Sequence, residues 1–104
     1  MAITSRALGT SASSIFTSAT TTGDAVTTMY FCNRSPSSVT FNMYLVPNGQ
    51  TANVNNVAYS NKVITSGDTY IIDMEKLVLG LGDMIQANAN TANAIVATVS
   101  TIGV

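Results

Sequence analysis

The stretch Val39-Thr40-Phe41-Asn42-Met43-Tyr44-Leu45-Val46 carries the clearest structural pattern in the chain. Apolar side chains occupy every second position from Val39 to Leu45, and Thr, Asn and Tyr fall between them. Successive side chains of a β-strand point to opposite faces, so this alternation predicts a strand with one buried face. The Pro47-Asn48-Gly49 sequence that follows is typical of a turn.

Similar short runs occur on both sides of this strand, separated by turn residues about every 8–12 positions. The predicted strands are Ser13–Ser18, Ala25–Asn33, Val39–Val46, Val57–Ile64, Thr69–Asp73, Met84–Asn88 and Ala94–Thr101. We interpret Met74–Leu81 as an extended corner. About seven antiparallel strands predict an all-β, immunoglobulin-like sandwich. A jelly roll, which has eight strands, is the alternative.

Three Gly-Asp pairs mark corners of the predicted sandwich. They are Gly23-Asp24, Gly67-Asp68 and Gly82-Asp83, and each precedes a predicted strand or apolar run. Glycine adopts the positive φ that tight turns require, and an Asp carboxylate accepts hydrogen bonds from nearby backbone amides. We therefore assign these three carboxylates to turns and not to chemistry.

The chain of 104 residues has the length of one domain. We divide it into an N-terminal arm, residues 1–10, which lacks core periodicity, and a single β-sandwich domain, residues 11–104. The apolar C-terminal sequence Ile102-Gly103-Val104 is open to two interpretations. It is either a frayed strand or an element that docks on a neighbouring subunit.

Charged residues make up 9% of the chain and the formal net charge is -1, whereas about 25% of residues are charged in an average soluble protein. This balance provides no field that would attract nucleic acid or an anionic membrane, and we expect neither partner. No run approaches the ~18 apolar residues of a membrane-spanning helix, and we expect no signal peptide. Low net charge favours self-association, so we expect a homo-oligomer.

The residue types that catalysis most often uses are scarce. The chain has no His, and Cys32 is the one cysteine, inside an apolar run where we expect a buried, inert thiol. Asp73 and Glu75 are the two carboxylates left outside the Gly-Asp pairs, and we interpret them as structural or solvated rather than as a cation site. We predict no catalytic, cofactor-binding or metal-binding residue and expect a protein that is not an enzyme.

Because we expect no catalysis, the function that we predict is contact with other molecules. The candidate interface residues are Ile3, Arg6, Leu8, Tyr59, Tyr70, Ile102 and Val104. Tyr59 and Tyr70 are the aromatic residues that we expect to be exposed. With Asn56 and Asn61 they also form the basis of an alternative hypothesis, a carbohydrate-binding or host-surface-binding module.

The order of motifs along nearly the whole chain is similar to that of a known group of proteins. Its pieces are Ala7-Leu8-Gly9-Thr10, Ile15-Phe16-Thr17, Phe31-Cys32-Asn33-Arg34-Ser35, Tyr44-Leu45-Val46-Pro47, Ser66-Gly67-Asp68-Thr69, Leu77-Val78-Leu79 and Gly82-Asp83-Met84-Ile85-Gln86-Ala87. This order resembles small β-sandwich virion proteins of tailed bacteriophages, which are accessory proteins of heads and tails.

The resemblance implies a structural role and provides no active site to transfer. It predicts a capsid decoration or cement protein, or a tail or neck accessory component, that acts through subunit interfaces. Its partners would be the major capsid or tail proteins of the same virion, in a particle assembled in the host cytoplasm. The resemblance leaves the choice between head, neck and tail open.

Overall fold

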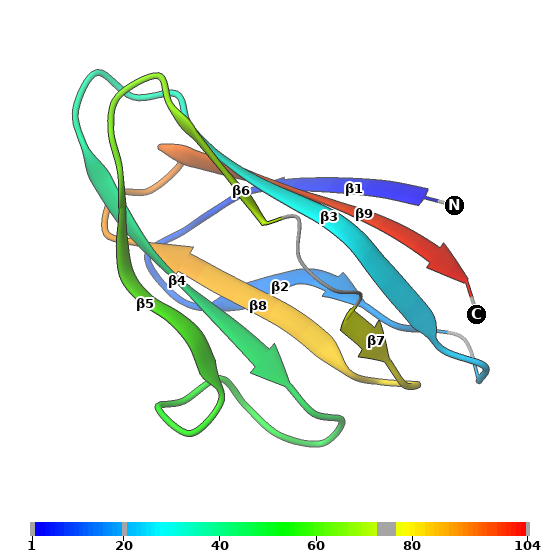
Figure 1. Ribbon diagram of the computed structural model, residues 1–104. Helices are drawn as coiled ribbons and strands as arrows, with labels where there is room; N and C mark the ends of the chain where they lie inside the picture. The colour runs from blue at the N-terminus through cyan, green and yellow to red at the C-terminus, as the bar shows by residue number, and fades with distance from the viewer. Residues whose placement is uncertain (1, 20, 73–76, 104) are drawn as a thin grey trace.

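The computed structural model describes residues 2–19, 21–72 and 77–103, and these residues form nine β-strands and no helix. The strands are β1 Ala2–Ala7, β2 Ser13–Thr17, β3 Asp24–Asn33, β4 Val39–Val46, β5 Val57–Ile64, β6 Thr69–Ile72, β7 Leu77–Leu79, β8 Met84–Ala89 and β9 Ile95–Gly103. Two antiparallel sheets face each other (Figure 1). The predicted all-β sandwich is therefore confirmed.

The chain is arranged as a nested hairpin that has been rolled up. β4 pairs with β5 at the tip, β3 pairs with β6 and β7, β2 pairs with β8, and β1 pairs with β9. Rolling adds two further pairings, β9 with β3 and β8 with β4. The sheets then have the orders β1-β9-β3-β6, with β7 also beside β3, and β2-β8-β4-β5.

This order identifies the type of sandwich. β6 and β7 occupy successive lengths of the same edge of β3, opposite Met29–Cys32 and Asp24–Val26, so each sheet has four strand positions. Eight positions wound as a rolled hairpin are a jelly roll, the alternative named above. The immunoglobulin order, in which the first strand lies beside the second, does not occur because β1 pairs with β9.

Most of the predicted strands lie where the sequence placed them. The strands at Val39–Val46 and Val57–Ile64 have the predicted bounds, and the others differ by one or two residues at their ends.

The segment 1–10 requires a correction, because it contains the edge strand β1 and the fully buried Leu8 instead of lying outside the sandwich as an arm. Its backbone is held because Leu8 N–H donates to the Ile95 carbonyl oxygen at 2.8 Å.

The core lies between the two sheets and is centred on a pair of phenylalanines. Phe31 of β3 and Phe41 of β4 are fully buried, and their rings stack with centroids 4.4 Å apart. Val39 and Met43 are also buried, as the alternation in β4 predicted, whereas Leu45 is half-buried. Stacked rings that join the two sheets contribute apolar burial and about 0.5–1.5 kcal/mol beyond it.

The three predicted Gly-Asp corners are confirmed. Gly23, Gly67 and Gly82 have φ angles of 92°, 74° and 83°, and they lie one or two residues before the first residues of β3, β6 and β8. In the last corner, the two carboxylate oxygens of Asp83 accept the backbone N–H groups of Asn48 and Gly80, each at 2.9 Å. This carboxylate therefore ties the start of the β4–β5 loop to the β7–β8 turn.

Candidate interaction face

Strand β9 defines the outer face of the five-stranded sheet. Its buried side chains alternate with side chains that point away from the core, from Val96 to Ile102. Directly opposed residues of neighbouring strands share a face, so the strand register assigns the rest of this surface. We call this surface the neutral face, and it consists of Ile3, Ser5, Ala7, Ala25, Thr28, Tyr30, Cys32, Thr69, Ile71, Val78, Val96, Thr98, Ser100 and Ile102.

The neutral face combines exposed apolar side chains with hydroxyl groups. Its exposed large apolar side chains are Ile3, Tyr30, Ile71, Val78 and Ile102. Two of the hydroxyls between them bond to each other, since Ser5 Oγ and Thr98 Oγ1 lie 3.1 Å apart. The surface that this face exposes to water is therefore partly apolar, and some of its hydroxyl groups already bond to each other.

The apolar groups of the neutral face form two areas. Tyr30 and Ile71 are directly opposite each other on β3 and β6. At the end of the sandwich where both chain ends lie (Figure 1), Ile102 and Val78 flank Ala25, which is only 2% exposed. Ala25 is therefore buried although the register places it on the outer face.

All charged side chains in the described ranges lie outside the neutral face. They are Arg6, Asp24, Arg34, Lys62, Asp68 and Asp83. Arg6, although it belongs to β1, donates from Nη1 to the Ser14 carbonyl oxygen of β2 at 3.2 Å. Asp24 Oδ2 accepts the hydroxyl of the buried Ser18 at 2.8 Å. These contacts place Arg6 and Asp24 at edges or corners of the sandwich.

The outer face of the four-stranded sheet differs from the neutral face because it presents side-chain amides. Asn42 Nδ2 donates to Asn88 Oδ1 at 3.0 Å, and Asn42 Oδ1 accepts the backbone N–H of Asn61 at 2.7 Å. Asn88 Nδ2 donates in turn to the Thr10 carbonyl oxygen at 3.1 Å. These amides bond mainly with each other and with the backbone, so they join strands and loops of this sheet.

The predicted interface residues separate into different environments. Ile3, which is 73% exposed, and Ile102 both lie on the neutral face. Leu8 is a core residue, fully buried, so its side chain is not available for contact in this structure. Arg6 lies at the β1–β2 edge of the sandwich, and Val104 is outside the described residues.

Tyr59 and Tyr70, which were predicted to be exposed, are half-buried in an aromatic cluster at the β5 and β6 edges. Their ring centroids are 5.8 Å apart at 77°, and each lies slightly more than 6 Å from Phe41. Lys62 Nζ lies 4.7 Å from the centroid of the Tyr70 ring, a cation–π contact. Burial, followed by the neighbouring Tyr70, raises the pKa of Tyr59 above its usual value. This cluster extends the core to the open edge between the sheets.

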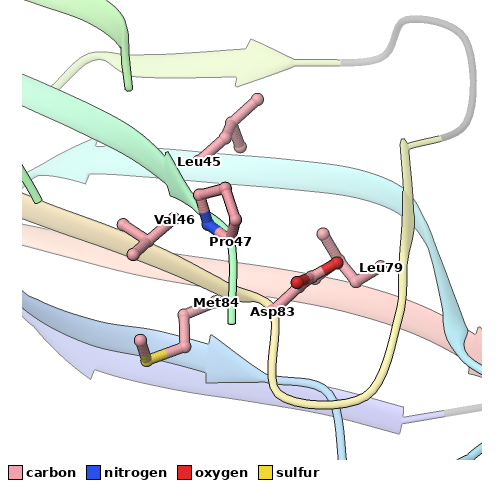
Figure 2. Close-up of a pocket in the computed structure, with 6 residues that line it drawn as sticks. All are labelled: Leu45, Val46, Pro47, Leu79, Asp83 and Met84. Carbon is pink, nitrogen blue, oxygen red and sulfur yellow. The ribbon is translucent and has the colours of Figure 1, made fainter. Parts of the chain in front are cut away.

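A small pocket lies at the end of the sandwich beside the Gly82-Asp83 corner (Figure 2). It has a volume of about 110 Å³ and is lined by Leu45, Val46, Pro47, Leu79, Asp83 and Met84. Asp83 is its one charged lining residue, and both carboxylate oxygens already accept backbone N–H groups. The other lining side chains are apolar, and the Asp83 carboxylate already serves to hold the corner.

Within the described ranges, no three His, Cys, Asp or Glu side chains are grouped to hold a metal ion. Asp73 and Glu75 lie outside those ranges. Cys32 is a free thiol, half-buried on the neutral face and not fully buried as predicted. The described residues thus provide surfaces for contact, and their most distinctive surface is the neutral face.

Of the five exposed large apolar residues of this face, the sequence analysis did not identify three, which are Tyr30, Ile71 and Val78. A signal for the first was present, because Tyr30 alternates with Met29 and Phe31 in a predicted strand. Two of those positions face the core, so the position between them must face outward. An exposed large apolar residue at such a position is a sign of a contact surface.

The class that this architecture defines is a jelly-roll sandwich in which the described residues of one outer face are uncharged and partly apolar. Comparison with known proteins found no matching family model, no matching curated protein and no matching solved structure. Along residues 2–19, 21–72 and 77–103, no helix has the length and apolar character needed to cross a membrane.

Proposed function

We propose that the protein is a non-enzymatic structural protein that acts by docking its neutral face on another protein subunit. The observation that carries the proposal is that the described residues of this face include five exposed large apolar side chains and no charged side chain. Protein interfaces are depleted of charge at their centres and enriched in aromatic residues. A docked subunit would remove this apolar surface from water, which stabilises the contact by about 25 cal/mol per Å² of apolar surface buried.

Within this class, we propose a structural component of a tailed-bacteriophage virion. The sequence resemblance supports this assignment, and the jelly-roll fold is compatible with it because that fold occurs in virion proteins. Decoration of the capsid and an accessory position on the tail or neck both require docking on a major capsid or tail protein. The particle would be assembled in the host cytoplasm.

The proposal is tested by incorporation into particles. The protein should be present in purified virions in a fixed stoichiometry, and Ile71→Lys should strongly reduce its incorporation because it buries a charge in the contact. Gln86→Lys is the matched control, since it places the same charge on the outer face of the four-stranded sheet. Absence from purified virions, or equal incorporation of both variants, would contradict the proposal.

A second function, binding of a carbohydrate or host surface, has one supporting observation. Tyr59 and Tyr70 do come together, with partial exposure, at the open edge of the sandwich. Of the two side-chain amides that were predicted to join them, the Asn56 amide is used elsewhere, because its Nδ2 donates to the Thr51 carbonyl oxygen at 2.8 Å. The backbone N–H of Asn61 donates to Asn42 Oδ1. Glycan-array binding that is lost in Tyr70→Ala would favour this second function.

A further inference from the structure

The edge strand β1 has features that suit pairing with another strand. Its register with β9 runs without interruption from Ala2, opposite Thr101, to Ala7, opposite Val96. It contains no proline and no bulge, which are common means of protecting a free edge. β2 and β5 have register shifts, and β6 and β7 have four and three residues. Among the described strands, β1 is therefore the most open edge.

The hydrogen-bonding pattern shows which backbone groups of β1 are directed outward. Leu8 N–H donates to the Ile95 carbonyl oxygen, one step beyond the pair Ala7 and Val96. In an antiparallel ladder the residues that bond to a given neighbour alternate along the strand. The even-numbered residues of β1 therefore face β9, and the N–H and C=O groups of Ile3, Ser5 and Ala7 face away from it.

We propose that β1 pairs antiparallel with β1 of a second copy of this chain, about a two-fold axis through Ser5. Directly opposed residues of two paired strands have their side chains on the same face of the sheet. A two-fold axis that relates two copies of one strand therefore lies midway between the two copies of one residue, which are directly opposite each other. We call this an axis through that residue. An axis through Ser5 pairs Ser5 with Ser5, and Ile3 with Ala7 in both directions. All three outward-facing residues of each copy then exchange backbone hydrogen bonds.

The side chains also fit this register better than the nearest alternative. An axis through Thr4 would place the apolar Ile3 opposite Ser5. With the axis through Ser5, Ile3 packs beside Ala7 on the outer surface, a large residue next to a small one. The neutral faces of the two copies then become one continuous surface. This inference rests on the β1 edge and holds whether or not the protein belongs to a virion.

Repulsion between the two Arg6 side chains should make the strength of the dimer depend on the salt concentration. In this register Arg6 of each copy is opposite Thr4 of the other, so the two Arg6 residues become diagonal neighbours. Diagonal positions across antiparallel strands are about 7–8 Å apart. Salt screens repulsion between exposed charges at this range, so we expect added NaCl to strengthen the dimer.

The first test is sedimentation equilibrium of the purified chain over a wide concentration range. We expect a reversible monomer–dimer equilibrium that Ser5→Pro abolishes, because proline removes the N–H at the axis and leaves the β9 ladder intact. Ser5→Ala keeps that N–H and should dimerise like the wild type. Ser5→Lys, which places two charges at the axis, is a second disrupting variant if the proline variant does not fold. A monomer at all concentrations, or a dimer that survives both disrupting variants, would overturn the proposal.

The second test reads the register by disulfide cross-linking in a Cys32→Ser background. Hydrogen-bonded antiparallel pairs have Cα atoms about 5.5 Å apart, within the range of a disulfide. Ser5→Cys should therefore cross-link to itself under mild oxidation. Ile3→Cys alone should not, whereas a mixture of Ile3→Cys and Ala7→Cys chains should form the mixed dimer. Efficient self-linking of Ile3→Cys would show that the proposed register is wrong.

Discussion

The buried side-chain amide of Asn33 donates to the carbonyl oxygen of Ile64 at 2.8 Å, linking the last residue of β3 to the last residue of β5. The same nitrogen donates to the Ser37 carbonyl oxygen at 2.9 Å, and Oδ1 accepts the Ser35 backbone N–H at 2.9 Å. The backbone N–H of Asn33 also bonds to the Asp68 carbonyl oxygen. One residue thus holds the β3–β4 and β5–β6 corners together.

We expect Asn33→Asp to destabilise the fold by at least about 3 kcal/mol, because it turns a buried carboxylate toward two carbonyl oxygens. Asn55→Asp, at an exposed position, should change the stability by no more than about 0.5 kcal/mol. Urea denaturation followed by circular dichroism at neutral pH measures both values. Similar midpoints for the two variants would show that the Asn33 amide contributes little.

Gly82 is predicted to be much less tolerant of a side chain than Gly49. Both have a φ of 83°, so Gly→Ala costs about 1–2 kcal/mol of backbone strain at either position. A Cβ at Gly82 would also lie 2.5 Å from the Asn48 side chain, whereas a Cβ at Gly49 meets nothing within 4 Å. Thermal denaturation should therefore show a larger loss for Gly82→Ala, and Asn48→Ala should recover part of it. Equal losses at the two glycines would contradict the steric explanation.

The segment 1–10 should be required for stability, not only for association. Leu8→Ala removes a fully buried side chain, and we expect a loss of about 2–5 kcal/mol. Ile3→Ala, at an exposed position of the same segment, should change the stability of the monomer by less than about 0.5 kcal/mol. Chemical denaturation at low protein concentration separates these effects from dimerisation. A stable domain after deletion of residues 1–10 would show that β1 and Leu8 are dispensable.

Tyr59 should make the fold sensitive to alkaline pH. Its pKa is raised in the folded protein, first by burial and then by Tyr70, so the unfolded state loses the Tyr59 proton at a lower pH than the folded state does. The stabilisation is thus complete below the unfolded pKa of about 10 and is lost as the pH rises through the folded pKa. Urea midpoints measured across this range should fall more steeply for the wild type than for Tyr59→Phe. Parallel curves would show that the Tyr59 hydroxyl does not contribute.

Strands whose pattern is local could be predicted from the sequence, whereas the pairing could not. Val39–Val46 alternates clearly because β4 is central in its sheet and buries one face. β1 was missed because, as an edge strand, it has exposed residues at Ile3 through Arg6 and no apolar alternation. The jelly-roll order depends on contacts such as Ser5 with Thr98, 93 residues apart, for which a local pattern has no signal.

The candidate site was predicted in part for the same reason. Ile3 and Ile102 were found because apolar residues near a chain end suggest contact. Tyr30 and Ile71 were missed because the alternation within a strand shows that a residue faces outward but does not show which outer face of the sandwich contacts another molecule. Tyr59 and Tyr70 were assigned to the surface, yet they are half-buried and their rings lie tilted beside Phe41. Such packing between different strands is visible only in three dimensions.

The rolled hairpin has a consequence for the order of folding. β4 and β5 are close in sequence, whereas β1 and β9 close a loop that includes nearly the whole chain, and long loops cost more entropy to close. We expect the tip to form first and the β1–β9 pair to form last, giving slow folding. The strand that offers its free edge to a second copy is therefore completed only after the core exists. Association is then restricted to molecules that have already folded, which limits aggregation of newly made chains.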